Sequence, residues 1–427
     1  MSHTGPPQPS TDHPDGGPWF WMYECLWRAT LPLLGLSPRL RQGWGQRLLR
    51  TPPGPAEVWI QAASGGEAFL AREIIAHLNP KRPLNLLTTT CTAQGMEILS
   101  RSDPGGPIHL QRAYFPFDAP RLMQQALDRI RPKVVVLLET ELWPGLLQAC
   151  AGRGITVLLL NARLSRRSLA GYLALPLPWR KTSPRAILAV SDRDAARYRL
   201  LFGPDSVGRM PNIKFDRCLS LRPIPYVDNP LSDLVRPGAP FVVLGSVRQQ
   251  EEQAVAWVVK ELLGKRPATL LGLFPRHMHR LEAWKQILKH HGLPWVLRSQ
   301  CTGPVPGGTV ILWDTFGELI QAYALARAVF VGGSLAPLGG QNFLEPLSQG
   351  VVPVIGPSWS NFSWVGEDIF EQGLVRRAAD APGLADALLD QLKKPLARDR
   401  VFALVRAFVQ AQQGGTQTAC LAIREAL

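Results

Sequence analysis

The residues best suited to chemistry form a glycine-rich stretch at positions 332–346, Gly-Gly-Ser-Leu-Ala-Pro-Leu-Gly-Gly-Gln-Asn-Phe-Leu-Glu-Pro. A buried strand over 328–331 is expected to run into these glycines, which then open a helix. Backbone N–H groups at a helix N-terminus bind phosphate without a metal. Glu345, about one turn into that helix, could hold the two hydroxyls of a ribose. The alternative is a tight turn that needs glycine only for its backbone geometry.

Polar residues also follow the predicted strands in the first half of the chain, at Ser64-Gly65-Gly66-Glu67, Thr88-Thr89-Thr90, Glu139 to Pro144 and Asn161-Ala162-Arg163. Glu67 could take a proton from an attacking hydroxyl, or it could simply stabilise the N-terminus of a helix by its charge. Glu139 ends the apolar run 134–138, where charges are rarely left unpaired. Its partner is either Arg163, in a structural ion pair, or a substrate hydroxyl.

The second half of the chain carries similar polar clusters after its predicted strands, at Ser246-Val247-Arg248, Pro275-Arg276-His277, Asp314 to Leu319 and Gly356-Pro357 with Asn361. Arg276 is placed to bind a phosphate with two parallel hydrogen bonds. His277 and His279 are better explained as surface histidines than as metal ligands. Because the second half of the chain has no acidic pair with D-x-D spacing beside these clusters, no metal site is predicted.

The elements that must position these residues are short β-branched runs that alternate with helical patterns, which is typical of parallel sheets covered by helices on both faces. The expected fold class is therefore α/β, with two Rossmann-like doubly wound domains that face each other across a cleft. Ligands bind at the carboxyl ends of such strands. Strands are predicted near 58–62, 84–88, 134–138, 155–160, 186–190, 241–245, 269–274, 309–313, 328–331 and 351–355.

The composition divides the chain into segments. A Pro-, Gly- and Ser-rich tail at 1–18 is expected to be disordered, and an apolar and basic segment follows at 19–50. The first Rossmann-like domain is predicted at 51–218 and the second at 241–380. They are separated by a proline-rich linker at 219–240, and helices are predicted over the C-terminal residues 381–427.

Length and charge limit the classes of function. The 427 residues are 46% hydrophobic and 19% charged, which indicates a globular protein of two domains. A net charge of +14, mainly from arginine, favours anionic partners. The arginines are spread over both domains rather than gathered in a stripe with aromatics, which disfavours a nucleic-acid-binding protein. Six scattered cysteines without a CxxC pair argue against a disulfide framework or a zinc site.

The segment after the tail is aromatic and then basic, with Trp19, Phe20, Trp21, Tyr23 and Trp27 followed by Arg39, Arg41, Arg47 and Arg50. Glu24 and Arg28 interrupt the apolar run and Pro32 would kink it, so it is a poor transmembrane span. Tryptophan and tyrosine favour the membrane interface. We expect an interfacial anchor on an anionic leaflet, the alternative being a helix that packs on the first domain.

Together these motifs resemble the 3-deoxy-D-manno-octulosonic acid (Kdo) transferases of lipopolysaccharide synthesis, a family of GT-B glycosyltransferases. The resemblance extends from about residue 37 to residue 373, and seven pieces carry it in one order: Tyr114 to Asp118, Glu139 to Pro144, Asn161 to Ser165, Asn212 to Asp216, Pro275 to His277, Asp314 to Leu319, and Gly339 to Asn342 with Leu344 to Pro346. The sequence departs from the family pattern at Gly65, at Gln341 and at Pro211.

The resemblance implies an inverting, metal-independent and cofactor-free transfer of Kdo from CMP-Kdo to the lipid A precursor lipid IVA, at the cytoplasmic face of the bacterial inner membrane. It implies a peripheral or monotopic protein with no nucleic-acid partner. Glu67 would be the general base. The acceptor side of the first domain would include Ser64, Gly66, Glu139, Glu141 and Arg163. The nucleotide side of the second domain would include Ser246, Arg248, Pro275, Arg276, His277, Gly317, Glu318, Gly339, Gly340, Asn342 and Glu345.

Two alternatives stay open at the level of sequence. The first is a GT-B transferase or epimerase that uses a UDP-sugar, since donor choice would depend on residues 246–248 and 314–319. The second, from another class, is a non-catalytic glycan- or nucleic-acid-binding protein. An inactive relative would be expected to lack Glu67 or Glu345, and this chain has both.

Overall fold

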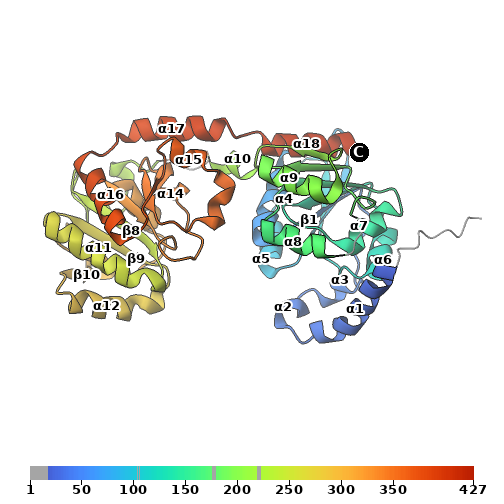
Figure 1. Cartoon of the computed structure of the whole chain (residues 1–427), viewed down its shortest axis with the longest axis horizontal. Coiled ribbons are helices and arrows are strands. Elements are labelled where there is room, and N and C mark those ends of the chain that lie inside the picture. Colours follow the sequence, from blue (N-terminus) through green and yellow to red (C-terminus); the bar gives the residue numbers. More distant parts are fainter. Residues whose placement is uncertain (1–17, 103, 105, 176–178, 219–222) are drawn as a thin grey trace, which may run out of the picture. The chain divides into compact units, whose positions relative to one another are not determined.

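A computed structural model describes residues 18–102, 104, 106–175, 179–218 and 223–427. The chain divides into two compact units (Figure 1). Unit 1 comprises residues 1–216 and 412–427, and unit 2 comprises residues 217–411. The predicted disordered tail lies outside the described residues except for its last residue, Pro18, which begins the first helix.

Unit 1 is built on a parallel sheet of seven described strands in the order β3-β2-β1-β4-β5-β6-β7. The strand order reverses its direction between β1 and β4, which pair with each other in the middle of the sheet. The carboxyl ends of these two strands and of β5 therefore lie side by side. The strands are β1 Val58–Gln61, β2 Leu84–Thr90, β3 Ile108–Tyr114, β4 Val134–Leu138, β5 Thr156–Ala162, β6 Ala186–Ala189 and β7 Val207–Arg209.

Helices cover both faces of this sheet because its strands alternate apolar side chains between two cores. Trp59 of β1 belongs to one core, and its neighbours Val58 and Ile60 belong to the other. Serine or threonine side chains cap several of the helices at their N-termini. The helices are α1 Pro18–Leu34, α2 Pro38–Arg41, α3 Trp44–Arg47, α4 Gly65–His77, α5 Ala93–Ser100, α6 Pro120–Ile130, α7 Pro144–Ala151, α8 Arg166–Ala174, α9 Asp192–Phe202 and α10 Lys214–Cys218.

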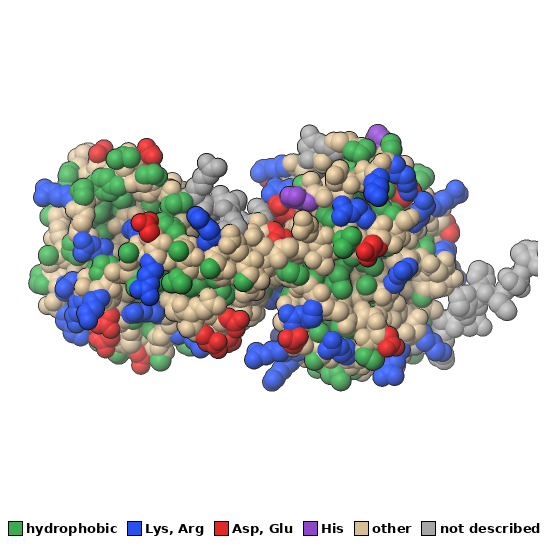
Figure 2. Space-filling view, turned by 90° about the horizontal axis from the view of Figure 1, so that it is seen from above, with side chains coloured by type: hydrophobic (Ala, Val, Ile, Leu, Met, Phe, Trp, Pro, Cys, Tyr) green, Lys and Arg blue, Asp and Glu red, His purple; other side chains and the backbone are tan. Residues whose placement is uncertain are grey.

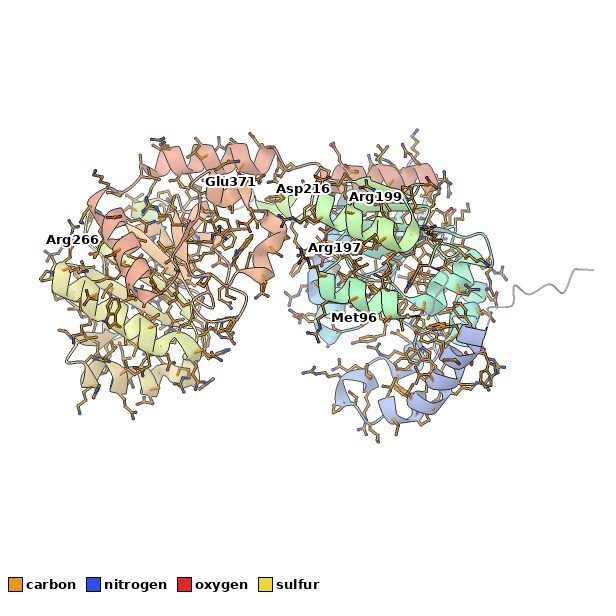
Figure 3. The ribbon with its side chains drawn as sticks, viewed as in Figure 1. Met96, Arg197, Arg199, Asp216, Arg266 and Glu371 are labelled. Carbon is orange, nitrogen blue, oxygen red and sulfur yellow. The ribbon has the colours of Figure 1, made fainter. Side chains whose placement is uncertain are left out.

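The last helix, α18 (Gly415–Ala426), belongs to unit 1 although the chain reaches it from unit 2. Ile423 and Cys420 are buried in the same core as α4. Asp216, labelled in Figure 3, accepts hydrogen bonds from the N–H groups of Gly414 at 2.9 Å and Thr416 at 2.6 Å. A carboxylate at this helix N-terminus satisfies donors that would otherwise lack a partner.

Helix α1 packs on unit 1 with one face and exposes the other. Phe20 is buried, Trp27 contacts the ring of Phe117, and the Tyr23 hydroxyl donates to Asp118 at 3.0 Å. The opposite face leaves large apolar side chains in solvent, namely Trp21, Met22, Leu26 and Leu33. None of the described helices is long and apolar enough to cross a membrane.

Unit 2 repeats the architecture with a second parallel sheet of seven described strands in the order β10-β11-β9-β8-β12-β13-β14. Its strands are β8 Phe241–Val247, β9 Leu270–Pro275, β10 Trp295–Leu297, β11 Val310–Leu312, β12 Ala328–Val331, β13 Pro353–Ile355 and β14 Arg376–Arg377. Its helices are α11 Glu252–Lys265, α12 Leu281–His290, α13 Leu319–Leu325, α14 Leu344–Ser348, α15 Asp368–Glu371, α16 Ala381–Lys393 and α17 Arg398–Gln410. The predicted class, two Rossmann-like α/β domains, is confirmed.

The stretch predicted as a linker divides in two. Residues 219–222 lie outside the described residues. From residue 223 onward the chain lies on unit 2, where Leu231, Leu234 and Val235 are buried and Asn229 donates to the carbonyl of Gln321 at 2.9 Å. The core of unit 2 therefore begins before the first strand of its sheet.

Candidate active site

Glu67 lies in the first turn of α4, directly beyond the carboxyl end of β1. Ser64 caps this helix, and its Oγ accepts from the Glu67 N–H at 3.3 Å. In return the Glu67 carboxylate accepts from the Ala63 N–H at 2.7 Å and from the Ser64 hydroxyl at 2.9 Å. These hydrogen bonds in both directions fix the side-chain conformation, so the carboxylate has one defined position at the end of the strand.

The electrostatics of Glu67 suit a general base. Burial raises the pKa of Glu67 to about 7, and the charge of Glu139 adds to the increase, while its two hydrogen bonds and the charge of Lys214 oppose it. Glu141 is partly buried, and this burial together with the charge of Glu67 raises the pKa of Glu141 to about 8. A carboxylate that titrates near neutral pH is matched to proton transfer.

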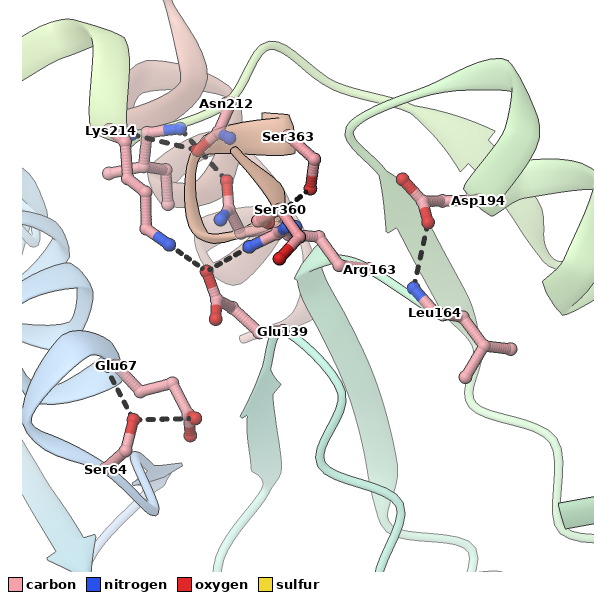
Figure 4. Close-up of polar contacts among 12 residues, drawn as sticks. Ser64, Glu67, Glu139, Arg163, Leu164, Asp194, Asn212, Lys214, Ser360 and Ser363 are labelled. Carbon is pink, nitrogen blue, oxygen red and sulfur yellow. Dashed lines mark hydrogen bonds and ion pairs between the residues drawn. The ribbon is translucent and has the colours of Figure 1, made fainter. Parts of the chain in front are cut away.

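Glu139 follows β4 and makes an ion pair that the sequence did not reveal. Its Oε1 lies 2.6 Å from Lys214 Nζ and 3.9 Å from the guanidinium of Arg163 (Figure 4). The expected partner Arg163 is therefore present, but the short contact is with Lys214. Glu139 has a φ of 55°, a conformation that costs roughly 1–2 kcal/mol for a residue with a side chain. Strain of this kind is concentrated at functional sites.

Two asparagines hold the segment that carries Lys214. Asn161 at the end of β5 accepts from the Ile213 N–H at 3.0 Å, and Asn212 accepts from the Lys214 N–H at 3.0 Å. Both belong to motifs that carry the family resemblance. Their roles in this fold are to place the ammonium group of Lys214 beside the strand ends of β4 and β5.

Asp118 belongs to another of these motifs. It is fully buried and lies apart from the cluster of Glu67, Glu139 and Glu141. It accepts from the N–H groups of Gly145 at 2.9 Å and Leu146 at 2.8 Å, at the start of α7. The segment that carries Glu139 and Glu141 runs directly into this helix. Asp118 therefore anchors the end of that segment at α7. Through its hydrogen bond with Tyr23, Asp118 also connects the segment to α1.

In unit 2 the glycine turn after β12 differs from expectation because a buried carboxylate of the protein occupies it. Glu251 accepts from the N–H groups of three consecutive residues, Gly333 at 2.6 Å, Ser334 at 2.9 Å and Leu335 at 2.8 Å. The glycines expected to offer N–H groups to a phosphate are also occupied: Gly339 donates to Ser358 Oγ and Gly340 donates to the carbonyl of Gly333. The fourth donor to Glu251 is the N–H of Arg248.

The end of the same turn keeps the features of an anion site. Among the described residues, the N–H groups of Asn342 and Phe343 have no acceptor in the protein. Asn342 Nδ2 donates to Glu345 Oε1 at 2.9 Å. Burial raises the pKa of Glu345, whereas the positive charge of Arg276 lowers it. Arg276 is exposed at the end of β9. Asn342, Glu345 and Arg276 are therefore brought together.

Other basic groups of unit 2 gather beyond β8 and β9. Partial desolvation, followed by the charges of Arg248, Arg276 and His279, lowers the pKa of His277. Pro275 ends β9 directly before this group. Ser246 has a φ of 55°, so the end of β8 carries the same kind of strained residue as the end of β4.

Glu318 is engaged by the protein itself. Arg298 contacts it with two hydrogen bonds, and Trp313 and Thr315 donate to Glu318 Oε2 at 2.8 and 2.7 Å. The predicted nucleotide residue Glu318 thus has both carboxylate oxygens occupied. Gly317 has a φ of 85°, which suits glycine, and so allows the turn that precedes Glu318.

The structure thus groups the predicted residues into two strand-end sites, one in each unit. Ser64, Gly66, Glu67, Glu139, Glu141 and Arg163 follow β1, β4 and β5 in unit 1, and the residues around Arg276, Asn342 and Glu345 follow β9 and β12 in unit 2. Lys214 and Glu251 were not among the residues predicted from the sequence. Lys214 lay in a quoted motif without a role, and no capping signal pointed to Glu251, because arginine at position 248 has no acceptor for a capping hydrogen bond.

Two Rossmann-like α/β units, each with a candidate site at the carboxyl ends of its strands, are the architecture of the GT-B fold class. A family model described as 3-deoxy-D-manno-octulosonic-acid transferase (kdotransferase) matches residues 42–217. The 3-deoxy-D-manno-octulosonic acid transferase of Bordetella pertussis is 33% identical over 409 residues, which cover 93% of this chain and 94% of that protein. The chain therefore belongs to the Kdo transferase family.

Further comparisons agree. The 3-deoxy-D-manno-octulosonic acid transferase of Haemophilus influenzae is 30% identical over 402 residues, covering 90% of this chain and 93% of that protein. Among solved structures, a glycosyltransferase from Rickettsia africae is similar with a TM-score of 0.54 and 13% identity, over 87% of this chain and 98% of that one. The first of these supports the family, and the second supports the fold.

Proposed function

We propose that this Kdo transferase moves Kdo from CMP-Kdo to a hydroxyl of a lipid A precursor, with inversion at the anomeric carbon and Glu67 as the general base. The observation that carries the proposal is the position and pKa of Glu67. A buried carboxylate with a pKa of about 7, fixed at a strand end, is ionised in a useful fraction of molecules at neutral pH.

In the proposed reaction the acceptor oxygen attacks the anomeric carbon of Kdo and passes its proton to Glu67. The bond from that carbon to the phosphate oxygen breaks at the same time, and its electron pair leaves with CMP. The hydrogen bonds from Ala63 and Ser64 hold the carboxylate in position without neutralising it. Protonated Glu141 would offer a hydrogen bond beside it, since the pKa of Glu141 is about 8.

On the donor side, the leaving phosphate would be stabilised by unit 2 without a metal. Arg276 and the unoccupied N–H groups of Asn342 and Phe343 supply positive charge and hydrogen bonds. Glu345, held by Asn342, would accept hydrogen bonds from the ribose. Gly339 and Gly340 would shape the turn, because their φ angles of 84° and 78° suit glycine.

The acceptor is a lipid, and we propose that α1 brings the enzyme to an anionic membrane surface. The outer face of α1 exposes 71% of Trp21 and 58% each of Met22 and Leu26. Exposed patches of this kind favour an interfacial site. Basic side chains are spread over the face shown in Figure 2, rather than gathered in one stripe as nucleic-acid binding would favour.

The test is a transfer assay with freshly generated CMP-Kdo and lipid IVA in the presence of EDTA. We expect the wild-type protein to transfer Kdo and Glu67→Gln to lose roughly 10²- to 10⁴-fold in kcat. Glu73→Gln, on the same helix α4 but outside the site, is the matched control and should retain activity. Full activity of Glu67→Gln would refute the role of Glu67.

The donor assignment is tested in the same experiment. If the wild-type protein consumes no CMP-Kdo while calorimetry shows that it binds a UDP-sugar, the donor proposal is wrong. Loss of transfer in EDTA that added Mg²⁺ restores would refute the metal-independent step.

A further inference from the structure

A small cavity of about 210 Å³ lies in unit 2, at the edge of the sheet opposite the glycine turn. Ala326 and Arg327 precede β12, and Val351 and Val352 precede β13, and all four line the cavity. It is therefore at the amino ends of these strands, whereas the glycine turn follows the carboxyl end of β12. The cavity is separate from the proposed donor site.

The lining of the cavity is strongly basic. Its charged residues are Arg327, Arg376, Lys394 and Arg398, and no aspartate or glutamate lines it. Within the described part of the chain, none of these four cations forms an ion pair with a carboxylate. The four positive charges around the cavity repel one another, and an anion bound in the cavity would relieve that repulsion.

Arg398 is the most enclosed of the four, and its position is fixed. Its guanidinium donates to the carbonyls of Gln349 and Ala326, the latter at 2.7 Å. Burial lowers the pKa of Arg398, so the charged form lacks full compensation in the protein. Gly350, with a φ of 74°, permits this close approach, because a Cβ there would lie 2.9 Å from Arg398 Cβ.

A second, independent feature points to a ligand with a hydrogen-bond donor. Gln391 lines the cavity and is only 7% exposed. Its Nε2 donates to the carbonyl of Val352 at 2.7 Å, which fixes the orientation of the amide. Its Oε1 is buried with no partner in the protein. A buried acceptor of this kind normally has a donor, such as a hydroxyl group, within reach.

Helix α17 adds to the positive potential, because it begins at Arg398 and no side chain caps its N-terminus. We propose that this cavity binds a phosphate ester that also carries a hydroxyl group, with Arg376, Lys394 and Arg398 on the phosphate and Gln391 Oε1 on the hydroxyl. The chemistry is that of a glycerol phosphate, either as a free small molecule or as the headgroup of an anionic lipid.

The experiment measures binding to the full-length protein at low ionic strength in a buffer without phosphate. Calorimetry with sn-glycerol 3-phosphate and with inorganic phosphate tests the free molecule, and flotation with phosphatidylglycerol vesicles tests the headgroup. Arg376→Gln and Lys394→Gln remove exposed cavity cations, so both variants should fold. Arg377→Gln is the matched control, since Arg377 is the next residue in β14 and instead pairs with Glu367.

We expect Arg376→Gln and Lys394→Gln each to weaken glycerol phosphate binding at least about tenfold, and Arg377→Gln to leave it unchanged. The same pattern seen only with vesicles would identify a lipid headgroup as the source. Arg276→Gln, at the proposed donor site, should not affect this binding, so the inference can fail or succeed independently of the proposed function. Absence of binding in both formats, or equal binding by Arg376→Gln and Arg377→Gln, would overturn it.

Discussion

Lys214 Nζ lies 2.6 Å from Glu139 Oε1, and this ion pair joins α10 to the end of β4 beside Glu67. The two charges act on Glu67 in opposite directions: the Glu139 carboxylate raises the pKa of Glu67 and the Lys214 ammonium lowers it. The two members of the pair therefore have opposite effects on the pKa of the proposed base. Its two members can be removed one at a time.

Lys214→Met should move the acid limb of the pH–rate profile to higher pH. The ionised form of Glu67 is the active one, so activity rises with pH as Glu67 loses its proton. Loss of a nearby cation raises the pKa of Glu67, and a higher pH is then needed for the same activity. Glu139→Gln should move the limb in the opposite direction, to lower pH. The measurement is kcat/KM between pH 5 and 9.

Lys81→Met is the control for this pair, because Lys81 is an exposed lysine of unit 1 away from the carboxylates. It should leave the profile unchanged. A shift of both variants in one direction would mean that they disturb the position of Glu67 rather than its electrostatics.

Glu141→Gln should remove the alkaline limb of the profile while keeping the acid limb. Burial and their mutual charge raise the pKa of both carboxyl groups, to about 7 for Glu67 and about 8 for Glu141, so the pair loses its two protons in separate steps. Above pH 8 Glu141 also ionises and places a second negative charge beside the base, which disfavours an anionic donor. Glutamine stays neutral at every pH, so the activity of the Glu141→Gln variant should not fall above pH 8. An unchanged alkaline limb would exclude Glu141 as its source.

The sequence predicted the interior strands of both sheets and missed the edge strands. β3, β7, β10 and β14 are the outermost strands of their sheets, and none was predicted. Interior parallel strands are buried on both faces and appear as apolar runs, such as residues 134–138. An edge strand buries less apolar surface, and β3 accordingly contains the polar residues His109, Gln111 and Arg112 among its seven positions.

In the candidate sites, too, the residues that local sequence patterns mark were predicted, and their partners from distant parts of the chain were not. Strand ends are local features, so Glu67, Glu139 and Arg276 were found from the sequence. The partner of Glu139 is 75 residues away, and Glu251 lies 82 residues from the glycine it binds. Such pairs depend on how the strands are ordered in the sheet, which the pattern of apolar residues does not specify.

Glu251→Ala should destabilise unit 2 by about 3 kcal/mol or more. The substitution leaves the N–H groups of Gly333, Ser334, Leu335 and Arg248 without an acceptor, and an unsatisfied buried donor costs roughly 1–3 kcal/mol. Urea unfolding monitored by tryptophan fluorescence measures the change. Glu261→Gln removes a partly exposed carboxylate on α11 and should cost less than about 1 kcal/mol. Equal stability of the two variants would contradict the role of Glu251 in holding the turn.

The outer face of α1 should bind membranes independently of the folding of unit 1. Met22→Ser combined with Leu26→Ser replaces two side chains that are each 58% exposed, so the melting temperature should not change. Because each side chain loses apolar area that a membrane would bury, flotation with anionic vesicles should fall at least about tenfold. Leu200→Ser, at an exposed leucine on α9, is the matched control and should float like the wild-type protein.

The same variants separate membrane binding from catalysis. With lipid IVA dispersed in detergent, the α1 double variant should keep its kcat, because Glu67 and its neighbours are untouched. With lipid IVA in vesicles its rate should fall with the loss of binding. If the double variant floats as the wild-type protein does, the exposed face of α1 is not the membrane anchor, and the basic surface would have to provide the attraction alone.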